Sequence, residues 1–183
     1  MIKTSICIIG GGNLAHVVGG YLAAKPDSEV RLLTRHPERW QADRSITITD
    51  CNNKVFKANF ATISHDPAIA VKGANIVLLC LPGFAIAPVL ESIRQYLDSS
   101  ALVGSVVSST GFFMMAQKIL PSTVKLFGFQ RVPFIARINE YGKTACLLGY
   151  KPSLKRMINF LPFTIYMVPF CMADASMRTP CMV

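Results

Sequence analysis

Short apolar runs alternate with helical patterns along the first 130 residues of the chain. Residues 5–10 and 74–81 are apolar without polar alternation, which is typical of parallel strands buried on both faces. Residues 13–24 place apolar side chains at helical spacing and stop before Pro26. Further strands are predicted at 29–34, 102–108 and 124–129, and further helices at 66–72, 84–97 and 112–120. This order predicts an α/β fold, a doubly wound parallel sheet with helices on both faces.

Two segments interrupt that alternation. Residues 45–63 contain β-rich runs separated by the turn-forming residues 51–54, and they predict an inserted β-hairpin. Residues 136–150 predict a second hairpin with its turn near Tyr141 and Gly142. Between the second strand and the first hairpin, Pro37 is expected to begin a helical turn over residues 36–43.

The length and charge of the chain narrow its class. With 183 residues, 51% hydrophobic and 16% charged, it is a globular protein rather than a disordered one. We predict one nucleotide-binding domain over residues 1–150 and an irregular tail over 151–183, without strand or helix period. The net charge is +2 over residues 1–100 and +7 over 101–183, which suits an anionic partner. Because the basic residues show no aromatic interleaving and no recognition helix, we predict no nucleic-acid partner.

Cysteine and histidine usage points away from metal and disulfide chemistry. The six cysteines have no C-x-x-C pair, and the three histidines have no spacing suited to zinc, so we predict reduced thiols and no metal site. No secretory signal is recognised, and the apolar stretch 158–173 is shorter than a membrane span and contains two prolines. We therefore expect a cytoplasmic protein without a membrane partner.

The strongest chemical signal follows the first predicted strand. Residues 10–15 read Gly-Gly-Gly-Asn-Leu-Ala, which matches the dinucleotide fingerprint G-x-G-x-x-A at a strand-to-helix junction. In such a site Gly10 allows the tight turn, Gly12 lets the backbone approach a pyrophosphate, and Ala15 keeps helix and strand close. The helix start offers free N–H groups and a positive dipole to the phosphates. We predict contacts from Gly10, Gly11, Gly12, Asn13, Leu14 and Ala15. His16 lies near this site and is expected to support the turn rather than act as a general acid.

The end of the second strand bears on the choice of cofactor. NAD sites usually place a carboxylate there, whereas this chain has Thr34 and Arg35 and no acid before Glu38. Arginine can pair with a 2′-phosphate and threonine can donate a hydrogen bond, so we predict NADP, with NAD as the alternative. Arg39 is interpreted as a solvated surface charge.

Two further loops follow predicted strands at the same edge of the sheet. Leu81 and Pro82 are predicted to flank the cofactor, although Pro82 equally suits a plain helix start. The hydroxyl groups of residues 108–110 are interpreted as a helix cap, with contact to nicotinamide or substrate as the alternative.

The run GGGNLAHVVGGYLA at 10–23 resembles the start of the opine dehydrogenase family of the octopine dehydrogenase type, and more distantly the ketopantoate reductase-like and 6-phosphogluconate dehydrogenase-like superfamily. Segments 46–64, 74–85 and 127–143 support the resemblance. It implies an oxidoreductase that condenses an α-keto acid with an amino acid, using NADH or NADPH. It also implies a C-terminal helical domain that carries the catalytic histidine.

Such a domain is not found in this sequence, so we expect a truncated product, the cofactor-binding half of such an enzyme, with no catalytic residue assigned. The keto acid and amino acid would then bind only if a second domain were supplied, and an exposed face would favour a homo-oligomer. The alternative function is a non-catalytic dinucleotide-binding module.

Overall fold

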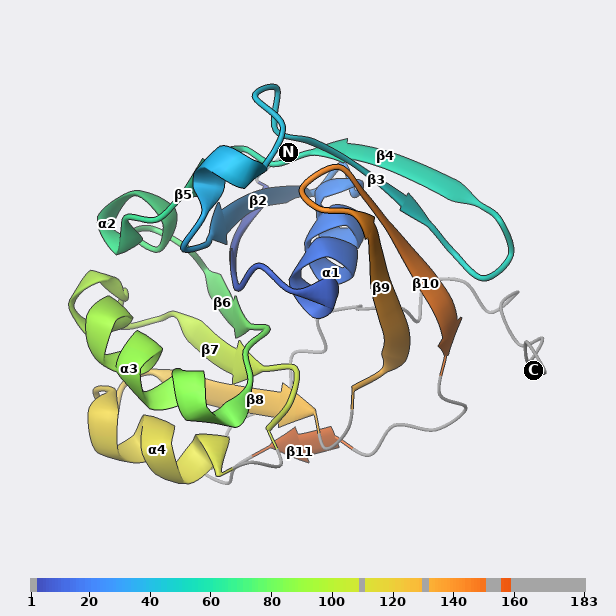
Figure 1. Cartoon of the computed structure of the whole chain (residues 1–183). Helices are drawn as coiled ribbons and strands as arrows, with labels where there is room; N and C mark the ends of the chain where they lie inside the picture. Colours follow the sequence, from blue (N-terminus) through green and yellow to red (C-terminus); the bar gives the residue numbers. More distant parts are fainter. Residues whose placement is uncertain (1–2, 109–110, 130–131, 151–155, 159–183) are drawn as a thin grey trace.

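A computed structural model describes residues 3–108, 111–129, 132–150 and 156–158. Its main sheet has seven strands in the order β11-β8-β7-β6-β1-β2-β5 (Figure 1). The strands are β1 (Thr4–Ile9), β2 (Ser28–Leu33), β5 (Thr62–Ser64), β6 (Ile76–Leu79), β7 (Leu102–Ser105), β8 (Lys125–Phe129) and β11 (Arg156–Ile158). All neighbours pair in parallel except β11, which is antiparallel to β8. The predicted doubly wound sheet is confirmed.

The helices form where apolar periodicity and start signals coincide. They are α1 (Asn13–Ala23), α2 (Pro67–Ala70), α3 (Gly83–Ile93) and α4 (Phe112–Ile119), with short 3-10 helices η1 (Pro37–Arg39) and η2 (Arg94–Tyr96). Asp66 caps α2 as its Oδ1 accepts a 2.8 Å hydrogen bond from the Ala68 N–H, and Pro67 occupies the first turn. The helices predicted at 13–24, 66–72, 84–97 and 112–120 are therefore confirmed, with ends shifted by a few residues.

The chain order of the sheet creates a switch point at β1. From β1 the chain moves outward through β2 to β5, and then returns to β6 on the other side of β1. The loops after β1 and β6 therefore leave the carboxyl edge of the sheet in opposite directions. Ligands of open α/β sheets bind in the crevice that such a divergence forms.

The two predicted hairpins join into a second sheet that the sequence does not predict. This sheet has the order β4-β3-β10-β9, with β3 (Ser45–Thr49), β4 (Val55–Asn59), β9 (Phe134–Glu140) and β10 (Thr144–Tyr150). Each hairpin is antiparallel, whereas β3 and β10 pair in parallel, with Thr47 opposite Thr144. The inserted hairpin is thus one half of a four-stranded layer.

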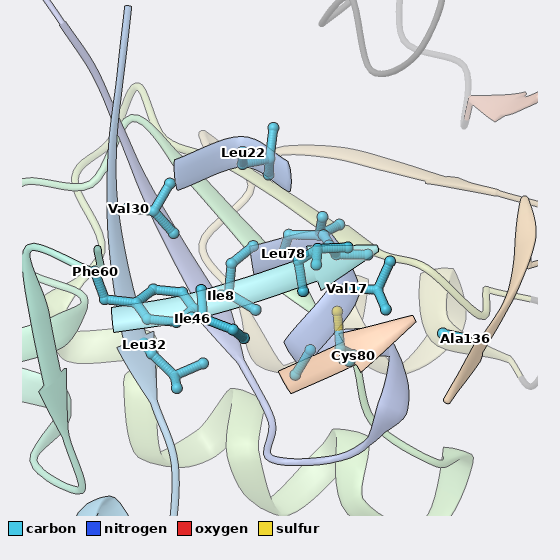
Figure 2. Packing of buried hydrophobic residues seen from close by; sticks show 14 of the residues in the cluster. Ile8, Val17, Leu22, Val30, Leu32, Ile46, Phe60, Leu78, Cys80 and Ala136 are labelled. Carbon is cyan, nitrogen blue, oxygen red and sulfur yellow. The ribbon is translucent and has the colours of Figure 1, made fainter. Parts of the chain in front are cut away.

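Helix α1 lies between the two sheets and contacts strands of both (Figure 1). The apolar residues of β3 face it, and Ile46 lies in the cluster of buried side chains around the helix (Figure 2). Ile46 and Ile48 are 1% and 0% exposed. Gly20 is required at the contact because a methyl group there would collide with the Ile48 side chain. Burial on two sides explains why α1 has few exposed positions.

The opposite face of the main sheet is covered by α2, α3 and α4. Alternate residues of β1 divide between the two cores, with Ile6 and Ile8 facing α1 and Cys7 and Ile9 facing the other helices. Burial raises the pKa of the Cys7 thiol to about 12, and it also raises the pKa of the Cys80 thiol. These two cysteines remain protonated and serve as packing residues.

Three details of the sequence prediction are wrong. The turn expected at 36–43 is helical only over Pro37–Arg39. The hairpin expected to reach residue 63 ends at Asn59, and Thr62–Ser64 instead joins the parallel sheet beside β2. Beyond residue 151, where no strand was expected, Arg156–Ile158 forms the edge strand. Long-range strand pairing decides the two strand segments, β5 with β2 and β11 with β8, and local patterns do not specify it. The other residues of the predicted tail lie outside the described part of the chain.

Candidate dinucleotide site

The glycine-rich turn occupies the switch point. Gly10 has a φ of 142°, and a methyl group built on it would come within 2.7 Å of the Cys80 carbonyl oxygen. The turn therefore needs glycine here both for its backbone angle and for its approach to the chain after β6. Ala15 packs on the other side, with its Cβ 3.4 Å from that same built methyl group. The roles predicted for Gly10 and Ala15 agree with this geometry.

The start of α1 faces open space. Gly12 is the N-cap residue and is exposed, and a methyl group built on it would have no atom within 4 Å. The first hydrogen bond of the helix runs from the His16 N–H to the Gly12 carbonyl. The backbone N–H groups of residues 13–15 therefore have no acceptor within the helix. Backbone N–H groups at an exposed, uncapped helix start, with free space beside a glycine, suit an anionic group such as a diphosphate.

Asn13 uses its side chain to hold the second sheet. Its Oδ1 accepts a 2.9 Å hydrogen bond from the Ile138 N–H in β9. The side-chain oxygen is therefore engaged with the protein, while the backbone amide stays at the helix start. The spacing of the glycine motif alone gives no sign of this second role.

His16 is a buried structural residue that connects the glycine turn to the β9–β10 turn. Its Nε2 lies 2.9 Å from the Gly142 N–H, and its Nδ1 lies 3.0 Å from the Gly12 carbonyl. Since Nε2 accepts, the proton is on Nδ1, which donates to Gly12. Burial lowers the pKa of His16 to about 4, against the opposing effect of the Gly12 hydrogen bond. The ring is thus neutral at pH 7, consistent with support for the turn and not with acid catalysis.

Thr34 and Arg35 stand at the end of β2 as predicted, in different environments. Thr34 is 5% exposed, and its Oγ1 lies 2.9 Å from a methyl group built on Gly11, so its side chain borders the glycine turn. Arg35 is exposed, and its guanidinium has no hydrogen-bond or ion-pair partner among the described residues. The next acid, Glu38, is exposed and lies 3.0 Å from His36. The pKa of Glu38 is lowered chiefly by a hydrogen bond from its own backbone N–H, and the hydrogen bond with His36 contributes less.

Tyr141 is the residue of this region that the sequence analysis did not assign. A methyl group built on Gly11 would come within 2.6 Å of the Tyr141 hydroxyl oxygen. The guanidinium of Arg39 lies over the Tyr141 ring, 4.1 Å from its centroid. Arg39 is exposed, as its interpretation as a surface charge expects, and its charged group is in addition stacked on an aromatic face. The sequence indicated only a turn near Tyr141 and Gly142, and the φ of 72° at Gly142 agrees with that turn.

The remaining predicted positions lie at the same edge. Leu81 follows β6 and is partly buried, and Pro82 is exposed and serves as the N-cap residue of α3. The helix-start interpretation of Pro82 is confirmed, and a cofactor contact stays a prediction. The hydroxyl of Ser108 donates a 2.6 Å hydrogen bond to the Phe129 carbonyl, and α4 is capped by Gly111 rather than by a hydroxyl group. Residues 109 and 110 lie outside the described residues.

Within the described ranges, no group of three or more His, Cys, Asp or Glu residues could hold a metal ion. None of the helices in the described part of the chain is long and apolar enough to cross a membrane.

Comparisons with known proteins agree with the geometry. Residues 6–143 match the family described as ketopantoate reductase PanE/ApbA. Octopine dehydrogenase of Pecten maximus is 33% identical over 166 residues, which are 84% of this chain and 42% of the relative. Two solved structures of octopine dehydrogenase, one with NADH and L-arginine and one with NADH and pyruvate, have a TM-score of 0.79 and 32% identity. They match 84% of this chain, which covers 41% and 42% of theirs. The chain thus spans less than half the length of these relatives.

Proposed function

The chain belongs to the ketopantoate reductase PanE/ApbA family, and from that premise we propose that it binds a nicotinamide dinucleotide at the switch point between β1 and β6. The observation that carries this proposal is the open helix start at Gly12, where a built methyl group meets no atom within 4 Å. The start of α1 combines the positive end of the helix dipole, backbone amides outside the helical hydrogen bonds, and space for a diphosphate. It lies at the edge of the sheet where α/β proteins bind ligands.

We propose described residues for three parts of such a cofactor, the diphosphate and the two riboses. The amides over residues 10–15 would hold the diphosphate. Thr34 and Arg35 would hold the adenosine ribose, and Leu81 and Pro82 the ribose on the nicotinamide side. When bound, the dinucleotide supplies hydride transfer, and the protein supplies position and electrostatics.

Among the two cofactors we propose NADP rather than NAD. The end of β2 offers the exposed Arg35 and no carboxylate, and Glu38 faces His36 instead. A guanidinium can bind a 2′-phosphate through two parallel N–H groups, whereas ribose hydroxyls are usually recognised by an acid at this position.

For the whole protein we propose the reductive condensation of an α-keto acid with an amino acid. The similarity to octopine dehydrogenase, solved with pyruvate and with L-arginine, supports this class of substrate. Substrate must be held at close distance above the nicotinamide, and a proton must be moved. None of the residues given a role above holds the substrate or moves the proton. The described residues therefore form the cofactor-binding part of the proposed enzyme.

A titration with NADPH and NADH tests the proposal. Trp40 is the single tryptophan of the chain and stacks on His16 with 4.2 Å between ring centroids, so its fluorescence reports on the region beside the glycine turn. We expect saturable binding of both cofactors, tighter for NADPH. Failure of both to bind at millimolar concentration would contradict the proposal. Turnover of pyruvate and a panel of amino acids would favour the enzyme over the module.

A further inference from the structure

Three segments far apart in sequence meet at Gly11. The hydroxyl groups of Thr34, at the end of β2, and of Tyr141, in the β9–β10 turn, lie 2.9 and 2.6 Å from a methyl group built on this glycine. The second sheet therefore contributes directly to the wall of the proposed cofactor site, through Tyr141. This wall stands at the end of β2, where the fold class recognises the adenosine ribose and its 2′ substituent.

The position of Tyr141 is fixed by the hydrogen bonds around its turn. On one side the Ile138 N–H donates to Asn13, and on the other the Gly142 N–H donates to His16. The Tyr141 ring also packs edge-on against the His16 ring, with centroids 4.9 Å apart. Both anchors belong to the first turn of α1, so Tyr141 keeps its place relative to the helix start that would hold the diphosphate.

Arg39 stacks on the Tyr141 ring and keeps its guanidinium N–H donors available. Its guanidinium lies 4.1 Å above the Tyr141 ring, and among the described residues no hydrogen bond or ion pair engages that group. Because all five N–H donors lie in the guanidinium plane, stacking leaves them free to bind an anion. Of the neighbouring acids, Glu38 pairs with His36 and Glu140 with Lys143, and the charge of Arg39 is a smaller contribution to the lowered pKa of Glu38.

We propose that Arg39, stacked on Tyr141, is a second cation for the 2′-phosphate of NADP(H), beside Arg35. This inference rests on the proposed cofactor site and adds a specificity-determining pair to it. A stacked arginine loses less side-chain freedom when it binds a phosphate than a mobile surface arginine does, so the pair provides a preorganised half of the phosphate site. The Tyr141 hydroxyl, beside Gly11, offers a further hydrogen-bond donor at the same place.

The test compares ligands that differ only in the 2′-phosphate. We would titrate the full chain and Arg39→Gln with NADPH and NADH, and with adenosine 2′,5′-bisphosphate and AMP, by calorimetry. Arg39→Gln should weaken NADPH and the bisphosphate by roughly tenfold or more, because it removes a charge-assisted bidentate contact. NADH and AMP should change by less than about twofold, since they lack the group that Arg39 binds.

Two matched variants separate this role from a structural one. Arg94→Gln removes an exposed arginine that pairs with Glu91 at 3.2 Å, and it should leave all four affinities unchanged. Tyr141→Leu removes the platform but not the charge, and it should weaken NADPH more than NADH. Circular dichroism of each variant verifies the fold. Arg39→Lys keeps the positive charge but lacks the two parallel N–H donors of a guanidinium. Its affinity for NADPH should therefore lie between those of Arg39→Gln and the natural chain.

The outcomes distinguish this inference from the function on which it rests. If the unaltered chain binds neither NADPH nor NADH, the cofactor site itself is refuted. If it binds them and Arg39→Gln affects both equally, or neither, the role of Arg39 is refuted while the site stands. Preference of the unaltered chain for NADH over NADPH would refute the 2′-phosphate role of Arg39 as well.

Discussion

The backbone N–H of Gly142 donates a 2.9 Å hydrogen bond to Nε2 of His16, 126 positions earlier in the chain. The bond is buried and joins the first turn of α1 to the turn between β9 and β10 in the second sheet. An unpaired buried N–H costs free energy, so this contact helps to fix the β9–β10 turn against α1. The position of Tyr141 next to Gly11 depends on it.

Acid should destabilise the protein through His16. Its folded pKa is about 4, against 6.5 for the free side chain, so the unfolded chain binds the proton more readily. The contribution of neutral His16 is fully present above pH 6.5 and is lost as the pH falls toward 4, by up to about 3 kcal/mol over that range. Urea unfolding at a series of pH values measures the loss.

Substitution of the histidines identifies the group responsible. His16→Gln should be less stable at pH 7 but should lose less stability between pH 6.5 and 4 than the natural chain. His65→Gln changes an exposed histidine and should retain the natural pH profile. An equal acid-side loss in His16→Gln and the natural chain would show that other groups cause it.

The first β-α-β unit of the fold is readable from sequence because its signals are local. Residues 5–10 and 13–24 carry their own periodicity, and the glycine motif between them specifies the turn. The second sheet has no such signal, because β3 and β10 pair through residues such as Thr47 and Thr144, about a hundred positions apart. Register between distant strands is decided by the shared core around α1, which no short window contains.

The same difference separates the predicted and the missed parts of the site. Gly10, Gly12 and Ala15 belong to one motif, and the structure places them together at the switch point. Tyr141 meets Gly11 and Arg39 only through folding of the β9–β10 turn onto α1. Their sequence neighbourhood indicates a hairpin turn and a surface helix turn, so their pairing could not be predicted locally.

Asn13→Asp should separate stability from cofactor binding. A carboxylate can still accept from the Ile138 N–H, and a negative charge at a helix start is favourable, so the free energy of unfolding should not fall. The same charge repels a diphosphate, and NADPH and NADH should both bind about tenfold more weakly, or more. Calorimetric titration and urea unfolding of the same preparation measure the two effects.

A charge control belongs with that experiment. Asn53→Asp adds the same charge in the β3–β4 turn, away from the glycine loop, and should leave cofactor affinity within about twofold because exposed charges are screened over a Debye length. Unchanged affinity in Asn13→Asp would argue that no diphosphate binds at the start of α1.

Two glycines of the motif should respond in opposite ways to alanine. Gly12→Ala meets no atom within 4 Å at an ordinary φ of −91°, so it should cost less than about 1 kcal/mol of stability. Its methyl group would occupy the space proposed for the diphosphate and should abolish binding of both cofactors. Gly10→Ala has a φ of 142° and a clash with the Cys80 carbonyl, and it should destabilise the fold by about 1–3 kcal/mol.

Thermal unfolding and cofactor titration of both variants give the comparison. A stable Gly12→Ala protein that binds NADPH with natural affinity would contradict the placement of the diphosphate. A Gly10→Ala protein as stable as the natural chain would contradict the turn geometry described here.

Arg35→Ala should change cofactor choice without changing stability. Its guanidinium is exposed and has no partner among the described residues, so its removal should alter the free energy of unfolding by less than about 0.5 kcal/mol. Loss of a charge-assisted phosphate contact should weaken NADPH by about tenfold and NADH by less than about twofold. Titration of both cofactors at two salt concentrations measures this effect, since the loss of NADPH affinity should shrink as salt screens the exposed charges.

The control is Arg94→Ala, which removes an exposed arginine at the end of α3 and should leave the ratio of NADPH to NADH affinity unchanged. An equal loss of both affinities in Arg35→Ala would place the arginine beside a group that the two cofactors share, and would remove the basis for an NADP preference.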